Sequence, residues 1–242
     1  MIFLGNTIKL LSVNVNGIRA SIKKGLEEFV TSVDPDIICL QEIRASKEQI
    51  GTLFEDYEGF IVPGLIKGHT GIATYVKGEA ELLDYWDGRF LQLKYRDWTI
   101  SNCYVPVGFP SKKKSKKEAL YEKLKFFEKM GKYTKMERHI LAGDFNVAHT
   151  ELDLHYESRS KIQGCTDEEA NAMSNLEMVD SFRLLNPETE RFSWWSSRGK
   201  SENKGWRIDY IFVSDDSKHR IIRADILDNQ ISDHSATFIE LK

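Results

Sequence analysis

An aspartate and an asparagine end an apolar run near the middle of the chain. Residues 139–142 have the composition of a buried strand, and Asp144 and Asn146 follow them two positions apart. In an extended chain, residues at this spacing point to the same face, so a carboxylate and an amide would be presented together. Burying such groups is costly unless a site uses them, but Gly, Asp and Asn are also common in turns. This stretch alone leaves a functional site and a turn equally open.

Similar polar groups end other strand-like runs along the chain. Each of them taken singly is explained as well by a turn or by a polar group that is satisfied in the core. Taken together, they predict one acidic, hydrogen-bonding site at which strand ends converge. The side chains are Asn14, Asn16, Gln41, Glu42, Tyr104, Asp144, Asn146, Asp209, Asp233 and His234.

The residue types indicate the chemistry of this site. Carboxylates and amides without cysteine suit a hard cation, Mg²⁺ with Mn²⁺ as a substitute. No GxSxG stretch supports a serine nucleophile, and glycoside hydrolysis would leave His234 and the paired asparagines without a task. Phosphodiester hydrolysis uses the whole set. In that reaction a metal neutralises phosphate charge, an aspartate activates water, and a histidine or tyrosine donates to a phosphoryl oxygen.

The elements that must position these groups are strands with helices between them. Runs rich in Ile, Val, Tyr and Phe predict strands, and apolar residues at helical spacing predict helices, one of which opens on a capping box of Thr166 and Glu169. The expected strands cover residues 8–15, 36–42, 71–77, 90–95, 98–105, 139–145, 207–213 and 236–241, and the expected helices cover 21–33, 116–130 and 166–176. The sequence therefore predicts an α/β or α+β fold. No repeat or linker divides it, so we expect one domain over residues 1–242.

Composition restricts the class of protein. The 242 residues are 41% hydrophobic and 29% charged, which is ordinary for a globular protein with a large core. No run approaches the roughly 18 apolar residues of a membrane span, and the N-terminus lacks the features of a signal peptide, so we expect no membrane partner. Cys39, Cys103 and Cys165 form no CxxC pair. They predict free thiols in a reducing compartment, in the cytoplasm, nucleoid or nucleus.

Lysine and arginine are concentrated in two segments, although the net charge of the chain is -3. A lysine run is most often a solvated loop, and the alternative is a surface that binds nucleic-acid phosphates. The segments are residues 111–117, with Lys112 and Lys113 among five lysines, and residues 198–207, with Arg198, Lys200, Lys204 and Arg207.

Six ordered motifs, from about residue 8 to the C-terminus, resemble the exonuclease III family of apurinic/apyrimidinic endonucleases, within the endonuclease/exonuclease/phosphatase superfamily. They are LSVNVNGIRA, ICLQEIR, YVPVG, LAGDFNVAHTELDL, GWRIDYIFVS and SDH. GDFN and SDH indicate only the superfamily, whereas NVNGIRA, LQEIR and GWRIDY point to its DNA-repair branch. The resemblance implies an α/β four-layered sandwich of two mixed β-sheets flanked by helices, as in DNase I. It also implies a Mg²⁺-dependent monomer that cuts double-stranded DNA 5′ to abasic sites and also processes 3′ ends as an exonuclease.

The same resemblance implies roles for the motif residues that would bind the metal and activate water. Glu42 looks like the principal Mg²⁺ ligand, with Asn16 beside it and Asp233 near the metal. Asp144 would activate the attacking water, and Asn146 would orient water or phosphate.

Further motif residues would act at the phosphate. His234 would contact the scissile phosphate, and Asp209 would hold its imidazole. Tyr104 would touch the phosphate or help the leaving oxygen. Asn14 would support the metal network of Glu42 and Asn16.

Recognition of an abasic nucleotide needs a tight apolar pocket, because the nucleotide is rotated out of the duplex. By their place in the motifs, aromatic and aliphatic residues form this pocket, although core packing is the alternative for each aromatic side chain. Basic residues would bind the duplex phosphates without reading bases. The expected substrate-binding residues are Trp194, Trp206, Ile208, Lys112, Lys113 and Arg207.

The chain departs from the family pattern at Val107, where the family has asparagine in YVPNG. Valine supplies no hydrogen-bond donor, and one lost donor is worth about 2–4 kcal/mol of transition-state stabilisation. Residues 155–165 also depart from the family's asparagine-rich segment. Three alternatives stay open: a nuclease with a shifted preference for 3′ ends or other damaged nucleotides, an enzyme acting on other phosphate esters, and a non-catalytic DNA-binding protein.

Overall fold

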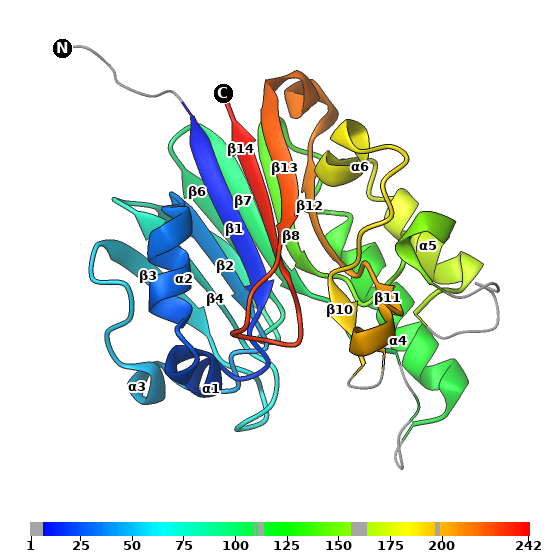
Figure 1. The fold of residues 1–242 in the computed structure, drawn as a ribbon, viewed down its shortest axis with the longest axis horizontal. Helices are drawn as coiled ribbons and strands as arrows, with labels where there is room; N and C mark the ends of the chain where they lie inside the picture. Colours follow the sequence, from blue (N-terminus) through cyan, green and yellow to red (C-terminus); the bar gives the residue numbers. More distant parts are fainter. Residues whose placement is uncertain (1–6, 109, 111–113, 156–163, 197–198) are drawn as a thin grey trace.

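The fold is described from a computed structural model, in which residues 7–108, 110, 114–155, 164–196 and 199–242 are placed. Within these residues, strands form two six-stranded sheets and one short hairpin (Figure 1). The first sheet has the order β13 (Ile221–Leu227), β14 (Ala236–Leu241), β1 (Ile8–Asn14), β2 (Ile37–Gln41), β4 (Ile72–Lys77) and β3 (Tyr57–Val62). The second has the order β5 (Glu81–Trp86), β6 (Phe90–Tyr95), β7 (Trp98–Tyr104), β8 (His139–Asp144), β12 (Asp209–Val213) and β9 (Val179–Asp180). The hairpin pairs β10 (Trp194–Trp195) with β11 (Gly205–Trp206).

Both sheets are mixed. β1 pairs with β2 in parallel, β7 pairs with β8 in parallel, and the other neighbours are antiparallel. The carboxyl ends of parallel strands meet at one edge of a sheet. Asn14 therefore lies opposite Gln41 in the first sheet, and Tyr104 lies opposite Asp144 in the second. Because β12 runs against β8, its first residue, Asp209, also lies opposite Asp144.

Alternating side chains produce three apolar layers. In β1, Leu10 packs into the core between the two sheets, whereas Leu11 packs under the helices on the outer face. In β8, Ile140 faces the inter-sheet core and Leu141 faces helices on the other side. Strands buried on both faces read as continuous apolar runs, which is the pattern that predicted them.

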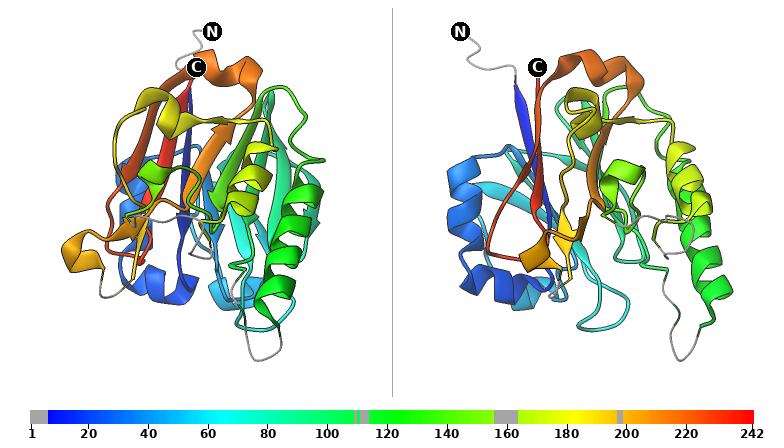
Figure 2. Two further views of the ribbon diagram at one scale, coloured as in Figure 1. Left: turned by 90° about the vertical axis from the view of Figure 1, so that its right-hand side faces the viewer. Right: turned by 45° about the vertical axis from the view of Figure 1, so that its right-hand side comes forward.

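Helices cover the outer face of each sheet (Figure 2). The predicted four-layered sandwich of two mixed sheets flanked by helices is confirmed. The helices are α1 (Ile18–Lys23), α2 (Leu26–Val33), α3 (Lys47–Ile50), α4 (Lys116–Met130), α5 (Asp167–Ser174) and α6 (Ser181–Leu185), with 3-10 turns at Glu151–Asp153, Lys200–Glu202 and Asp215–Arg220. In the described part of the chain, no helix is both long and apolar enough to cross a bilayer.

The single helix expected over residues 21–33 is wrong. The chain forms α1 and α2 there instead, because Gly25 adopts a left-handed backbone conformation with φ of 92° and caps the second helix. The helix expected over residues 116–130 is confirmed as α4, and the Thr166–Glu169 capping box opens α5.

All eight expected strands are present within one or two residues, but further strands were not expected from the sequence. The clearest omission is β5, an edge strand in which Leu82, Leu83 and Tyr85 are exposed. Because β5 lies at the edge of its sheet and exposes apolar side chains to solvent, its sequence does not alternate between apolar and polar residues in the way that predicts a strand. β13 is another, since Arg223 and Asp225 interrupt its apolar residues.

Candidate active site

The strand ends meet at a cavity of about 490 Å³ at one end of the sandwich. Its walls come from both sheets and from the β10–β11 hairpin. The lining residues are Asn14, Asn16, Glu42, Arg44, Tyr104, Val107, Asp144, Asn146, Gly164, Trp194, Trp206, Ile208, Asp233 and His234. Most of the residues expected at the site are therefore brought together, and the convergence that was predicted from strand ends exists.

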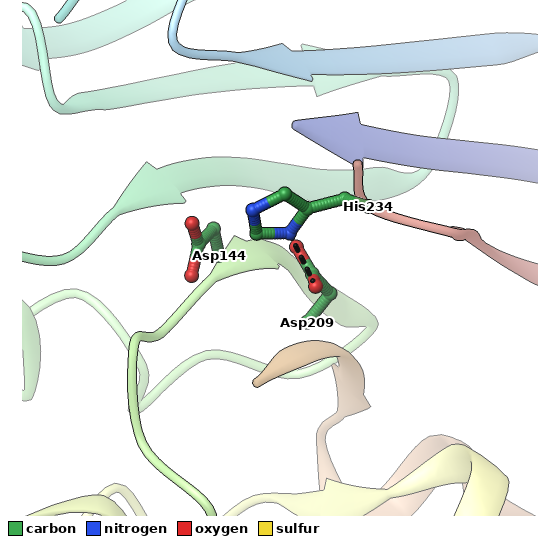
Figure 3. Close-up of side chains that lie close together, drawn as sticks. All are labelled: Asp144, Asp209 and His234. Atoms are coloured by element: carbon green, nitrogen blue, oxygen red, sulfur yellow. Dashed lines mark hydrogen bonds and ion pairs between the residues drawn. The ribbon is translucent and has the colours of Figure 1, made fainter. Parts of the chain in front are cut away.

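Asp209 lies behind the cavity and binds the histidine that faces it. Its Oδ2 atom is 2.9 Å from Nδ1 of His234 (Figure 3). The same oxygen also accepts a 2.6 Å hydrogen bond from the Ser193 hydroxyl. The same Ser193 oxygen accepts hydrogen bonds from the backbone N–H groups of Ile208 and Asp209. Ser193 thus fixes the carboxylate, and the carboxylate fixes the imidazole with Nε2 free of a protein partner among the described residues.

Asp209 keeps His234 protonated. Burial by itself lowers the pKa of His234, but the charge and hydrogen bond of the Asp209 carboxylate, with the charges of Asp144 and Asp233 added, outweigh it and raise that pKa to about 9. The imidazolium therefore carries a proton on Nε2 at neutral pH. Such a group donates a charge-assisted hydrogen bond to an anion such as a phosphate.

Asp144 is a buried acid with both oxygens engaged. Oδ2 accepts a 2.8 Å hydrogen bond from Nδ2 of Asn14, and Oδ1 accepts one of 2.9 Å from the backbone N–H of Asn146. Burial, followed by the charge of Asp209, raises the pKa of Asp144 to about 7. A carboxyl group with such a pKa is suited to take a proton from water near neutral pH.

Two ligands expected for the metal are linked to the Asp144 network. Asn14 Nδ2 also donates to Oε2 of Glu42, at 3.1 Å, and Arg44 Nε donates to the other oxygen of Glu42 at 3.0 Å. Asn16 Nδ2 donates to Oδ1 of Asp233 at 2.9 Å. The cavity thus places three oxygen-bearing side chains, Glu42, Asn16 and Asp233, on the side of the first sheet.

Four polar residues at the cavity have left-handed backbones. The φ angles are 44° for Asn16, 56° for Glu42, 50° for Arg44 and 52° for Asn146. Non-glycine residues seldom adopt this conformation, and holding one there costs on the order of 1 kcal/mol or more. Each of them follows shortly after the end of β1, β2 or β8, so the turns of the backbone lie at the strand ends that form the cavity.

The donor set fits a hard cation. Carboxylates and amides make up most of the polar residues of the lining, and no cysteine is among them. Asp144, Asp209 and His234 also offer ligand atoms that all lie within 4.8 Å of one another (Figure 3). That trio suits a cation poorly at His234, because its Nδ1 is bound to Asp209 and the ring is protonated. The oxygen-rich side formed by Glu42, Asn16 and Asp233 suits one better.

Tyr104 reaches the cavity from the end of β7. Burial is the main cause that raises the pKa of its hydroxyl, with the charge of Asp144 adding to it, so the phenol keeps its proton and can donate. The Arg89 guanidinium lies 4.7 Å from the centre of the Tyr104 ring and donates to the Tyr104 carbonyl at 2.9 Å. These contacts fix the ring at the cavity wall.

The expected apolar pocket residues form one wall. Trp194 and Trp206 pair across the hairpin, with ring centres 6.0 Å apart and planes nearly perpendicular. Ile208 lies on the chain just after Trp206 and also lines the cavity. Trp194 Nε1 donates to Oδ2 of Asp233 at 3.3 Å, so the aromatic wall is attached to the acidic one.

The phosphate contact expected of Arg207 is wrong. Its side chain is 0% exposed and forms ion pairs with Asp153, at 2.7 Å, and Asp180, at 2.7 Å. Both of its neighbours in sequence face the cavity, so the arginine between them points the opposite way, into the protein. Lys112, Lys113 and Arg198 lie outside the described residues.

Several residues that build the site were given no role from the sequence. Arg44 lies in the LQEIR motif, two positions after Glu42, and that proximity was a usable signal. Ser193 and Gly164 carried no local signal, because their contacts join segments far apart in the chain.

Comparisons with known proteins found relatives over most of the chain. A model of the Endonuclease/Exonuclease/phosphatase family matches residues 11–234. An exodeoxyribonuclease of Bacillus subtilis is 34% identical over 248 residues, covering 94% of this chain and 96% of that protein. A DNA-(apurinic or apyrimidinic site) endonuclease of Dictyostelium discoideum is 33% identical over 227 residues, covering 86% of this chain but only 63% of that protein.

Solved structures share the fold. An AP endonuclease from Archaeoglobus fulgidus superposes with a TM-score of 0.81 at 24% identity, covering 96% of this chain and 98% of that one. An AP endonuclease from Leishmania major superposes with a TM-score of 0.83, also at 24% identity, covering 98% of this chain and 88% of that one.

Proposed function

This chain belongs to the endonuclease/exonuclease/phosphatase family, and from that premise we propose that it is a Mg²⁺-dependent DNA repair nuclease that cuts duplex DNA 5′ to abasic sites. The observation that carries the proposal is the shared cavity. A protonated His234 held by Asp209, a buried Asp144 and an apolar aromatic wall line or adjoin one space. The names of the Bacillus and Dictyostelium relatives support both parts, DNA cleavage and the abasic site.

The residues divide the hydrolysis between them. Asp144 takes a proton from a water molecule that Asn146 orients, and the water oxygen attacks phosphorus. His234 donates to a non-bridging oxygen as negative charge grows there. The bond from phosphorus to the 3′ oxygen breaks, and the Tyr104 hydroxyl donates to that leaving oxygen. The products are a 3′-hydroxyl and a 5′-deoxyribose phosphate.

Glu42, Asn16 and Asp233 are the residues that would hold the metal. When bound, Mg²⁺ or Mn²⁺ supplies charge neutralisation at the phosphate. Arg44 now occupies one oxygen of Glu42 and leaves less negative charge there for a cation. Its guanidinium is partly exposed, so it is free to move aside without a large loss of packing.

Selection of abasic sites follows from the apolar wall. Trp194, Trp206 and Ile208 offer a flipped deoxyribose a mainly apolar surface, and the indole N–H of Trp194 is already used by Asp233. An intact nucleotide must bring its base into the same space. The cost of unstacking is lowest where no base is present, which adds to the preference.

Duplex DNA also needs a basic surface beside the cavity. A second cavity of about 610 Å³ adjoins the active site at Arg89, whose guanidinium lies over the Tyr104 ring. Its wall carries four cationic side chains, Arg89, Lys114, Lys125 and Lys129, and two acidic ones, Asp87 and Glu122. This excess of positive charge next to the reaction centre suits the phosphates that flank the cut. We propose that the protein binds duplex DNA here as a monomer, in a reducing compartment where its three buried cysteines stay free.

One observation favours a second candidate, a nuclease with a shifted preference for 3′ ends. Val107 lines the cavity where the family pattern has asparagine, and it offers the phosphate no donor. A weaker hold on the phosphate favours ends that reach the site without nucleotide flipping.

The test uses one labelled duplex that carries a single abasic-site analogue, with and without Mg²⁺. An undamaged duplex and a duplex with a frayed 3′ end serve as controls. A single Mg²⁺-dependent cut 5′ to the lesion is expected. Shortening from the 3′ end without that cut would replace the first proposal by the second, and no cleavage of any duplex would overturn both.

A further inference from the structure

A fully buried lysine lies behind the cavity. Lys123, on the inner face of α4, is 0% exposed, and Nζ has three acceptors. They are Oε1 of Glu169 at 2.6 Å, the Asn146 carbonyl at 2.7 Å and the Val107 carbonyl at 3.4 Å. An ammonium group has three N–H donors, so all three are used inside the protein. Lys123 is therefore unable to contact DNA.

Glu169 extends the same network to a third loop. Its Oε2 atom accepts hydrogen bonds from the backbone N–H groups of Gly164, at 2.9 Å, and Thr166, at 3.1 Å. Glu169 itself is 0% exposed. The Lys123–Glu169 pair thus joins the segments that follow β7 and β8 to the segment that precedes α5.

The three joined segments contribute both to the water-activating residues of the site and to its nucleotide pocket. Asn146 has a left-handed backbone, and its N–H donates to Asp144, so the position of its carbonyl bears on the water-activating pair. Gly164 lies between the Asn146 carbonyl and the Trp206 side chain of the pocket. A methyl group added at Gly164 would lie 3.2 Å from the Asn146 oxygen and 3.1 Å from Cζ3 of Trp206.

Gly108 packs against the aliphatic part of the Lys123 side chain. A methyl group there would lie 3.0 Å from Cδ of Lys123, and the φ of Gly108 is 78°. The lysine stem is held by this backbone, and its head holds two carbonyls. A lysine placed in this way has one geometry available to it, which is the property of a group that positions others.

A buried ion pair is seldom the most stable filling for such a space. Apolar residues of similar volume are often as stabilising, because both charges lose their hydration. Stability alone therefore accounts poorly for a charged pair here. What an apolar pair lacks is donors for the carbonyls of Asn146 and Val107.

We propose that the Lys123–Glu169 pair positions the active site, by holding the Asn146 backbone and the Gly164 wall of the nucleotide pocket in register. The inference rests on the proposed function of the same site. Lys123 and Glu169 are positioning residues, since neither touches substrate. Their effect passes through Asn146 and Asp144 to the attacking water.

The test compares two variants and one control. Lys123→Met keeps the length of the side chain but removes its donors, and leaves the Glu169 charge unpaired. Lys123→Met combined with Glu169→Gln also removes that charge, and the amide that replaces the carboxylate still has an oxygen for Gly164 and Thr166. Lys132→Met removes an exposed lysine just beyond the end of α4 and serves as the matched control.

Three measurements are made on each protein: urea unfolding, duplex affinity without metal, and kcat and KM with metal. We expect the double variant to remain folded, with a small loss of stability because two carbonyls lose their donor, and to bind DNA and show a KM within about twofold of the parent. We expect kcat to fall by about 10- to 100-fold, as small misplacements of reacting groups do. Lys132→Met should change none of these. A stable double variant with unchanged kcat would overturn the inference, and so would a loss that lies entirely in KM.

Two readouts separate this inference from the proposed function. Bis(4-nitrophenyl) phosphate is hydrolysed beside the abasic duplex, because it needs the same phosphodiester chemistry without a DNA pocket. If the parent cuts only the small ester, the abasic assignment fails while the kcat comparison still decides the role of the pair. If the parent cuts neither, both fail. The backbone amide NMR signals of Asn146 and Gly164 should move in the double variant, and unmoved signals would count against positioning.

Discussion

Asp144 and Asp209 lie directly opposite each other on the antiparallel strands β8 and β12. Paired residues share a face of a sheet, so two acids are held side by side with His234 next to both (Figure 3). The charge of Asp209 disfavours ionisation of Asp144, and the nearby imidazolium of His234 offsets part of that effect. The two acids therefore have different roles. Asp209 is hydrogen-bonded to His234, while the pKa of Asp144 rises to about 7.

Replacing Asp144 by asparagine should abolish cleavage and spare DNA binding. The amide keeps the shape of the carboxyl group but takes no proton from water, which should lower kcat by at least about 10²-fold. Single-turnover cleavage and metal-free duplex affinity are the measurements. Unchanged turnover in this variant would sink the assigned mechanism.

The rate should show a bell-shaped dependence on pH. Below about 7 Asp144 is protonated and accepts no proton, and above about 9 His234 loses the proton that it donates. The plateau should therefore lie between these values, with tenfold losses per unit outside it. In Asp209→Asn the upper limb should move to lower pH, because the charge that raises the pKa of His234 is gone. An upper limb that does not move would contradict the role of Asp209.

Asparagine at position 107 should raise kcat. It would return a hydrogen-bond donor to a cavity wall that now has none at that place, and one such donor is worth about 2–4 kcal/mol in a preorganised site. An increase of at least about tenfold in abasic cleavage is expected for Val107→Asn, with Val107→Ala as the control for side-chain size. Equal rates in the parent and the asparagine variant would show that another group already fills this role.

Arg207→Met should lower stability without altering the salt dependence of DNA binding. The substitution leaves Asp153 buried without its main partner, and breaking such a pair costs about 3–5 kcal/mol. A phosphate contact would instead reduce the slope of log affinity against log salt by about one. Urea unfolding and salt titrations of duplex affinity distinguish the two outcomes.

Acid should destabilise the protein through His139. Burial lowers the pKa of His139 to about 4, whereas the unfolded side chain titrates at 6.5. Between these values the unfolded state binds the extra proton. The stability contributed by neutral His139 is therefore fully present above pH 6.5. It is lost as the pH falls to 4, which lowers the free energy of unfolding by about 3 kcal/mol in all. Urea unfolding between pH 7.5 and 4 should show this loss, and His139→Gln should flatten it.

Much of the fold followed from apolar runs. Strands buried on both faces, such as β1 and β8, are visible in the sequence, and α4 was bounded correctly by its apolar spacing. β5 and β13 were missed because edge strands mix exposed apolar and charged residues. The break at Gly25 was missed because one glycine inside a helical pattern is often tolerated.

The site was predictable where a motif marks the residue itself. Asp144, Asn146 and His234 end or precede strands and were placed correctly at one cavity. The direction of Arg207 depended on the alternation of side chains at the start of β12, which the motif alone did not resolve. The Lys123–Glu169 pair was missed because the two residues are 46 positions apart in the chain, and only the fold brings them into contact.

The geometry of the active site also depends on how the two sheets pack against each other. Asn14 and Glu42 come from the first sheet, Asp144 and Asp209 from the second, and His234 reaches from a loop of the first to an acid of the second. Sliding of one sheet over the other by even about 1 Å would misplace these groups, while each sheet would keep its own hydrogen bonds. Activity should therefore vanish at lower denaturant concentration than β-structure does, and a bound phosphodiester, clamped by both sheets, should narrow that gap.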